Sequence, residues 1–94
     1  LHTGEYCHAT PPDRGRELAR LAAAAARGAE LGLEVAAGHG LTRHLVLDIA
    51  ALPHVVELNI GHALIADALL LGLERAIDGF RTAIQRGLGR RGGA

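Results

Sequence analysis

Two short segments, each an apolar run that leads into a Gly-His pair, constrain the fold of this chain more than any other feature. The first covers residues 35–41 (VAAGHGL) and the second covers residues 57–63 (ELNIGHA). Each pattern predicts a buried strand that ends in a glycine turn, and each turn opens a helical pattern. Strands that alternate with helices form βαβ units, so we expect a parallel sheet with both turns at one edge.

The remaining sequence supplies the other elements of this alternation. Gly32 is placed to end the first long helix in the left-handed conformation, and Gly72 divides the last helical stretch in two. In chain order we expect a strand end at 1–4, a helix at 14–31 capped by Asp13, a strand at 33–37, a helix at 42–51 capped by Thr42, a strand at 55–60, a short helix at 62–71, an amphipathic helix at 73–88 and a frayed tail at 89–94.

This order of elements predicts an α/β fold, namely the C-terminal part of a (β/α)8 (TIM) barrel with parallel strands and crossover helices. Such barrels place the active site at the carboxyl ends of the strands. They often bind phosphate between the last strand-following loops and a short extra helix. The 94 residues correspond to about a quarter to a third of eight βα units. We therefore expect residues 1–94 to form one portion of a single barrel domain whose N-terminal part is absent.

Composition excludes several classes of function. The formal net charge is zero and aromatic residues make up 2% of the chain, whereas a nucleic-acid surface needs basic residues and stacking rings. The longest apolar region, residues 60–73, is interrupted by His62 and Asp67, so we expect no membrane span. The single cysteine, Cys7, favours a reducing compartment and is expected to lie unreactive on a loop. We expect a cytoplasmic protein that uses no cofactor.

The two Gly-His turns contain the candidate site. Gly40 and Gly61 let the backbone approach an anion closely, and the helix that begins after Gly61 adds partial positive charge at its N-terminus. His39 lies between two glycines, and an imidazole side chain suits a proton donor or acceptor. His62, at the start of the helix, is placed to donate to a phosphate. These residues favour a phosphate-binding catalytic site over turns without chemistry.

Other polar residues leave further possibilities open. Glu57 and Asn59 have the same parity, so they point to one face of the last strand, where catalytic and structural roles fit the pattern equally well. A metal site formed by His2, His39 and His62 is geometrically possible. However, no helical histidine pair supports it, and we expect no metal.

Five segments of the sequence resemble the pyridoxine 5′-phosphate synthase family: LHTG at 1–4, ELARL at 17–21, LGL at 31–33, AGHGLT at 37–42 and ELNIGHA at 57–63. The resemblance extends over nearly the whole chain without evident gaps. It implies a barrel enzyme that condenses 3-amino-2-oxopropyl phosphate with 1-deoxy-D-xylulose 5-phosphate. The implied products are pyridoxine 5′-phosphate, phosphate and water, in the ring-closing step of a vitamin B6 pathway.

The same resemblance implies roles for individual residues. His39 matches the family's proton donor, and Gly40, Gly61 and His62 match positions that bind 3-amino-2-oxopropyl phosphate. Ala36 stands where the family usually has asparagine, so a polar group near the donor is missing. The family's other catalytic histidine and glutamate belong to the N-terminal part, so we expect the isolated segment to be inactive. The resemblance also implies a homo-oligomer of barrels.

Two other functions fit the residues as well. One is another phosphate-binding barrel enzyme, an isomerase or a lyase, with the same terminal phosphate site. The other is a non-catalytic binding or assembly module, or a gene fragment. The coding sequence upstream of Leu1 would separate these readings, because the synthase family has a histidine and a glutamate as general bases on its early strands.

Overall fold

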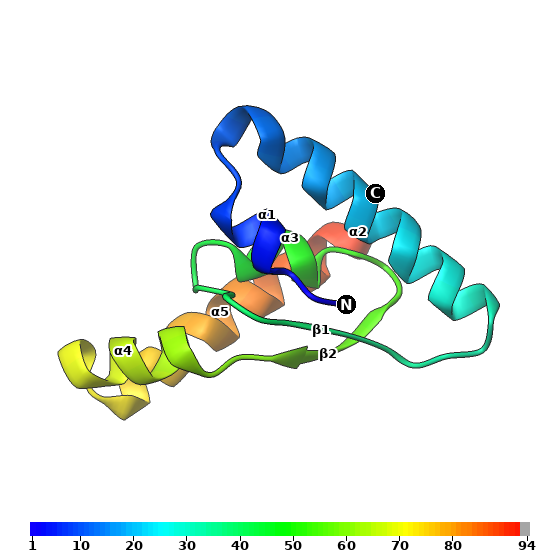
Figure 1. Ribbon diagram of the computed structural model, residues 1–94. Coiled ribbons are helices and arrows are strands. Elements are labelled where there is room, and N and C mark those ends of the chain that lie inside the picture. Colours follow the sequence, from blue (N-terminus) through cyan, green and yellow to red (C-terminus); the bar gives the residue numbers. More distant parts are fainter. Residues whose placement is uncertain (93–94) are drawn as a thin grey trace.

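The chain folds as an α/β unit in which helices pack on a small parallel sheet (Figure 1). The computed structural model describes residues 1–92. Within them, the elements in chain order are α1 (Gly4–His8), α2 (Pro11–Glu30), β1 (Val35–Gly38), α3 (Val46–Ala50), β2 (Val55–Asn59), α4 (His62–Leu71) and α5 (Leu73–Gly92). In Figure 1, β1 and β2 run along the lower side of the molecule, and α1, α2 and α3 lie above them.

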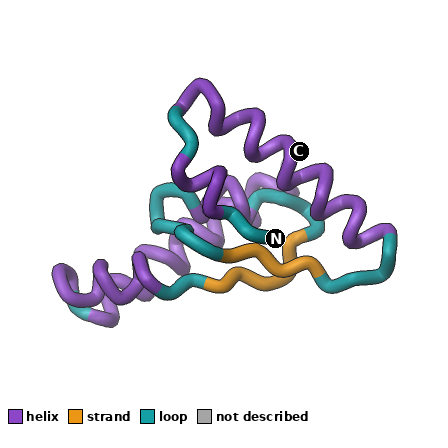
Figure 2. Tube along the Cα trace, in the orientation of Figure 1, coloured by secondary structure: helices purple, strands orange, loops and turns teal. Residues whose placement is uncertain are grey.

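The strands pair in parallel and in chain order. β1 pairs with β2 from Val35 with Val55 to Gly38 with Asn59, with one irregularity after Val35. On the other side of β1, His2 forms a parallel bridge with Gly38, so the N-terminal residues are the end of a third strand-like segment. Figure 2 shows β1 and β2 side by side, with the N-terminus next to them. The predicted α/β fold with parallel strands is confirmed, and the barrel stays a prediction.

The two faces of the sheet have different surroundings. Ala37 of β1 and Val55 of β2 are buried in the core beneath the helices. On the opposite face, Glu57 and Asn59 are exposed, and Glu57 lies in register with Ala36. The expectation that Glu57 and Asn59 share a face is confirmed. Within residues 1–92 this face is open to solvent.

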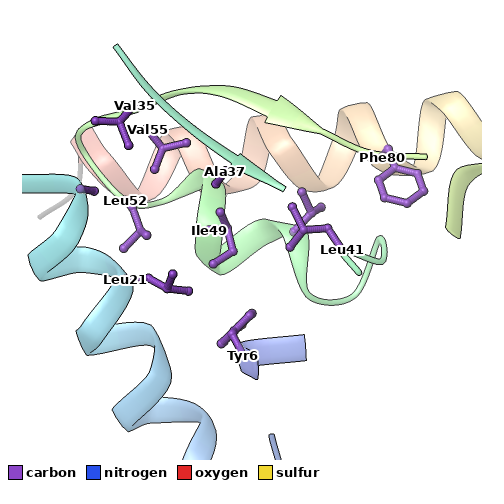
Figure 3. Close-up of a cluster of buried hydrophobic side chains, with 11 residues drawn as sticks. Tyr6, Leu21, Val35, Ala37, Leu41, Ile49, Leu52, Val55 and Phe80 are labelled. Atoms are coloured by element: carbon purple, nitrogen blue, oxygen red, sulfur yellow. The ribbon is translucent and has the colours of Figure 1, made fainter. Parts of the chain in front are cut away.

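The hydrophobic core lies between the sheet and α2, α3 and α5. Ile49 of α3 is fully buried and lies near the middle of the cluster in Figure 3, between Ala37 and Leu21. The cluster consists of Tyr6, Leu21, Ala25, Val35, Ala37, Leu41, Val46, Ile49, Leu52, Val55 and Phe80. Burial of each larger apolar side chain contributes about 1.5–3 kcal/mol, so this cluster is the main source of stability.

The long helix α2 begins earlier than predicted. Its N-cap is Thr10, and Pro11 and Pro12 occupy its first positions. The N–H groups at the start of a helix have no intrahelical acceptor, so proline costs little there, and its fixed φ angle suits the helix. Asp13, expected to be the cap, lies instead in the first turn, where its carboxylate accepts a hydrogen bond from Thr10 Oγ1 at 3.3 Å.

The end of α2 follows the prediction for Gly32. This glycine has φ +79°, the left-handed conformation. Its N–H donates to the Ala29 carbonyl at 3.0 Å, and the Leu33 N–H donates to the Gly28 carbonyl at 3.0 Å. These two bonds form a Schellman motif, which satisfies carbonyls that the last helical turn would otherwise leave unpaired. The motif turns the chain from α2 toward β1, which starts at Val35 rather than at residue 33.

A short helix, α1, stands where the sequence indicated a loop. Cys7 therefore lies on a helix, contrary to the prediction. The Tyr6 hydroxyl donates to Asp48 Oδ2 at 3.2 Å, and burial together with the Asp48 carboxylate raises the pKa of Tyr6 to about 12. Arg90 of α5 donates to the other oxygen of Asp48 at 3.1 Å. Contacts with distant segments hold α1 in place, which explains why its own five residues did not predict it.

The helix expected at 42–51 is shorter than predicted. α3 covers Val46–Ala50, and a turn precedes it. Thr42 does act as an N-terminal cap, but of this turn, because its Oγ1 accepts a hydrogen bond from the Leu45 N–H at 3.2 Å. Val46 and Ile49 are fully buried.

The C-terminal helices divide at Gly72, as predicted, but α5 extends further than expected. Gly72 has φ +87° and separates α4 from α5. α5 continues through Gly92, so residues 89–92 are helical rather than frayed, and residues 93–94 of the predicted tail lie outside the described residues. Arg91 donates to the carbonyls of Ala50 at 2.8 Å and Val55 at 2.7 Å, which ties the last turn to the start of β2.

No helix within residues 1–92 combines the length and apolar character that a membrane crossing needs.

Gly87 allows α5 to pack closely against α3. A Cβ atom at this position would overlap the Leu47 carbonyl oxygen and would lie 2.7 Å from the Ala50 Cβ. Gly89, two residues further along the same helix, has open space around it in the described structure. The two glycines therefore differ in what an added methyl group would meet.

We expect Gly87→Ala to destabilise the chain by about 1–3 kcal/mol, because the overlap with backbone must force α5 away from α3. Gly89→Ala is the matched control. It should stabilise by about 0.5–1 kcal/mol, since alanine has the higher helix propensity and meets no neighbour. Urea denaturation followed by circular dichroism measures both differences. Equal effects of the two substitutions would contradict the close packing of α3 and α5.

Candidate active site

The two Gly-His turns follow neighbouring strand ends. β1 ends at Gly38 and β2 ends at Asn59, and these residues pair with each other. A Cβ atom at Gly38 would lie 2.8 Å from the Asn59 Cβ and 3.0 Å from its carbonyl oxygen. Glycine at this position therefore permits the close approach of the strand ends, which places both turns at one edge of the sheet.

A cavity of about 600 Å³ lies between the two turns. All four residues predicted for the site line it: His39 and Gly40 from the first turn, and Gly61 and His62 from the second. The structure thus brings together residues that lie 23 positions apart in the sequence (39 and 62). Their roles in binding and catalysis stay predictions.

His39 has a conformation that is rare for a residue with a side chain. Its φ angle is +91°, whereas positive φ is costly for residues other than glycine. The fully buried Thr3 donates a hydrogen bond from Oγ1 to the His39 carbonyl at 2.6 Å. The His39 side chain remains exposed at the cavity. Strained backbone of this kind is concentrated at functional sites, which is consistent with a catalytic role for His39.

The two glycines of the site are needed for different reasons. Gly40 has φ +77°, so a side chain there would be strained, and a Cβ atom would lie 3.4 Å from the Cys7 Cβ. Gly61 has φ −139° and ψ −76°, outside the left-handed region, and an added Cβ would meet nothing within 4 Å in the described structure. The fold therefore requires glycine at position 40, but at position 61 it leaves space beside the backbone that a ligand can use.

The N-terminus of α4 faces the same cavity. Gly61 is the N-cap, and no side chain within residues 1–92 caps the helix. The first intrahelical bond runs from the Ile65 N–H to the Gly61 carbonyl at 3.0 Å. The preceding amides of the first turn, including that of His62, are therefore available to an external acceptor. Together with the helix dipole, they favour an anion at this end of the cavity.

The histidines of the three strand ends do not form a metal-binding arrangement. The rings of His2 and His39 are stacked, with centroids 4.1 Å apart and an interplanar angle of 26°. Stacked rings present their faces to each other, whereas metal ligands direct ring nitrogens to a common point. Within residues 1–92, no group of three or more potential ligands could hold a metal ion.

Sequence reasoning missed part of the cavity wall. Cys7 and His8, both from α1, line it together with Thr42 and Asn59. α1 itself was not predicted, so no local signal pointed to its two residues. Burial raises the pKa of Cys7 above its ordinary value, and the nearby Thr3 hydroxyl and Arg14 only partly offset this effect. The thiol is therefore protonated at neutral pH, which agrees with the expectation that it is unreactive.

The fold and the cavity define an α/β protein with parallel strands and a candidate site at their carboxyl ends. The family comparison is more specific. Residues 1–86 match the model of the family described as pyridoxal phosphate biosynthesis protein PdxJ. The chain belongs to this family, and the resemblance inferred from its motifs is confirmed.

Similar curated proteins carry the name pyridoxine 5′-phosphate synthase. The one from Thioalkalivibrio sulfidiphilus is 53% identical over 87 residues, which are 92% of this chain and 35% of the relative. The one from Jannaschia sp. is 53% identical over 85 residues, which are 86% of this chain and 34% of the relative. A cyanobacterial protein from Cyanothece sp. is 49% identical over 86 residues, 90% of this chain and 36% of the relative. The chain thus spans about a third of the length of these relatives.

We expect the alkylation of Cys7 by iodoacetamide to have its pH midpoint above that of an unperturbed cysteine. The raised pKa means that the reactive thiolate appears only at higher pH, so the rate at pH 8 should fall below that of the same chain unfolded in urea. Rates measured between pH 6 and pH 10 by mass spectrometry test this. A folded chain that reacts faster than the unfolded chain at pH 7 would contradict the protonated state.

Proposed function

We propose that this chain is the C-terminal part of a pyridoxine 5′-phosphate synthase with a (β/α)8 barrel fold. The reaction condenses 3-amino-2-oxopropyl phosphate with 1-deoxy-D-xylulose 5-phosphate and releases phosphate and water. The observation that carries the proposal is the meeting of two Gly-His turns at one cavity in a chain of the PdxJ family. The names of the similar curated proteins support the same activity.

The second turn is proposed to hold the phosphate group of 3-amino-2-oxopropyl phosphate. Gly61 leaves room beside its backbone, and the uncapped first turn of α4 offers amide donors and a partial positive charge. His62 lies at the first position of the same helix and lines the cavity, so its ring is placed to add a further donor. Gly40, on the opposite turn, also lines the cavity and is proposed to bind the same substrate through its backbone, and a residue with a side chain would be strained there.

His39 is the proposed proton donor. Loss of water or phosphate during ring closure requires a proton on the departing oxygen, and an imidazole near neutral pH supplies one effectively. The exposed ring at the cavity wall is accessible to a substrate held by α4. General acid catalysis of this kind accounts for about two to four orders of magnitude in rate.

The rest of the barrel is proposed to cover the open face of the sheet and to supply the remaining catalytic groups. Glu57 and Asn59 are exposed on that face, which would be the interior of the proposed barrel. In a closed barrel a carboxylate such as Glu57 would need a hydrogen-bonding or charged partner. The chain by itself has only one proposed acid–base group, which supports the expectation that it is inactive alone.

The complete protein is proposed to be a cytoplasmic homo-oligomer. Large apolar side chains are exposed along α4 and at the start of α5: Leu69 is 84% and Leu70 is 85% exposed, and Ile65 and Leu73 are also exposed. Exposed large apolar side chains of this kind favour contact with another protein surface. A second copy of the complete protein is the proposed occupant.

We expect this chain to support synthesis of pyridoxine 5′-phosphate when it replaces the matching segment of the Thioalkalivibrio sulfidiphilus synthase. The identity of 53% over 87 residues makes such a chimera compatible with the relative's remaining strands. Chromatographic detection of the product measures activity, and light scattering of the same sample measures oligomeric state. The isolated chain should make no product. A folded chimera without activity, beside an active parent, would contradict the proposed function.

Within the chimera, His39→Asn and Gly61→Val should separate turnover from binding. His39→Asn should lower kcat by about two to four orders of magnitude, because it removes the proton donor. Gly61→Val should mainly raise KM for 3-amino-2-oxopropyl phosphate, because a Cβ atom there meets no described atom within 4 Å and the added side chain occupies space proposed for the phosphate. Steady-state kinetics with both substrates provides the values. Normal turnover of His39→Asn would exclude the proton-donor role and would make His62 the next candidate.

A further inference from the structure

We infer that Thr3 and His2 position the proton donor: Thr3 sets the backbone of His39, and His2 sets the orientation of its ring. Both residues belong to the N-terminal strand end, which neighbours β1. They act through His39 and are therefore positioning residues. The inference rests on the proposed function, in which His39 donates a proton.

Thr3 holds the two peptide groups that flank the Cα atom of His39. Its N–H donates to the Gly38 carbonyl at 2.8 Å, and its Oγ1 donates to the His39 carbonyl at 2.6 Å. The first carbonyl belongs to the peptide before His39 and the second to the peptide after it. The orientations of these two peptides define φ and ψ of His39. One residue thus determines both backbone angles of the proposed donor.

The energetic need for such a restraint follows from the conformation of His39. A φ angle of +91° is unfavourable for an L-residue with a side chain, so the local sequence alone would not keep it. Thr3 is 0% exposed, which protects its two hydrogen bonds from competition with water. The buried hydroxyl also has to be satisfied, and the His39 carbonyl satisfies it.

The ring of His39 is held by a second contact. It stacks on the ring of His2 at a centroid distance of 4.1 Å. The Gly4 N–H donates to Nδ1 of His2 at 3.3 Å, which restrains the His2 ring in turn. A Cβ atom at Gly4 would lie 2.6 Å from Cε1 of His2 and 3.0 Å from Cδ2 of His39. The missing side chain of Gly4 is what makes room for the stacked pair.

Together, these contacts restrain both the backbone and the ring of His39. Thr3 fixes where the His39 side chain leaves the backbone, and His2 limits rotation of the ring. A catalytic group contributes most when neighbouring residues hold it in its productive geometry. Loss of either restraint should therefore lower turnover while leaving phosphate binding at α4 unchanged.

Thr3→Val in the synthase chimera tests the backbone restraint. The substitution keeps the shape of the side chain and removes the hydroxyl, so kcat should fall about fivefold to tenfold, as expected for one lost hydrogen bond, with little change in KM. Thr3→Ser keeps the hydroxyl and should recover kcat to within about twofold of the unsubstituted chimera. Thr82→Val, an exposed threonine of α5, is the matched control and should leave both constants unchanged. The folded fraction, measured by circular dichroism, corrects kcat for loss of stability.

His2→Ala tests the ring restraint and is the second variant if Thr3→Val does not fold, because it removes the stacked ring and leaves both hydrogen bonds of Thr3 in place. We expect kcat to fall about threefold or more, with KM unchanged, through loss of the stacked pair. An unchanged kcat in either folded variant, or a loss that Thr3→Ser does not recover, would overturn the inference.

If the unsubstituted chimera is inactive, the proposed function fails separately. Crystal structures of the unsubstituted and Thr3→Val chimeras then decide the inference, since His39 should leave the left-handed region only in the variant.

Discussion

The close pairing of Gly38 with Asn59 is the contact on which the candidate site depends. Parallel strands end at one edge of a sheet, but only strands that end at the same level bring the following turns together. The absence of a side chain at Gly38 permits this, because a Cβ atom would lie 2.8 Å from the Asn59 Cβ. The cavity, the approach of His39 to the start of α4 and the placement of His62 all follow from this contact.

The site uses each strand end for a different purpose. The N-terminal segment contributes Thr3 and His2, which contact His39 and do not line the cavity. β1 leads to the strained His39, and β2 leads to the helix amides behind Gly61. The proposed anion site at α4 and the proposed, separately restrained proton donor would suit a reaction that must bind a phosphate and also protonate a leaving oxygen.

The open face of the sheet supports the proposal that this segment holds only part of a catalytic site. The helices bury one side of β1 and β2, whereas Glu57 and Asn59 are exposed on the other side within the described residues. The relatives are about three times as long as the matched region, so they contain enough further chain to cover this face. Residues that are exposed here would then be interior residues of the complete protein, which is where polar side chains of barrel enzymes act.

The sequence by itself determined the parallel α/β fold, the break at Gly72, the stop at Gly32 and the residues of the cavity's two turns. These features depend on local chemistry: hydrophobic periodicity for the strands, and the backbone freedom of glycine for the turns and helix ends. Only the tertiary structure decided the features that depend on distant partners. α1 is held by the bond from Tyr6 to Asp48, and the last turn of α5 is held by Arg91 on carbonyls near β2. The left-handed backbone of His39 is held by Thr3, 36 positions earlier in the chain. Such contacts leave no periodic pattern, because the two partners meet only after the strands between them have paired.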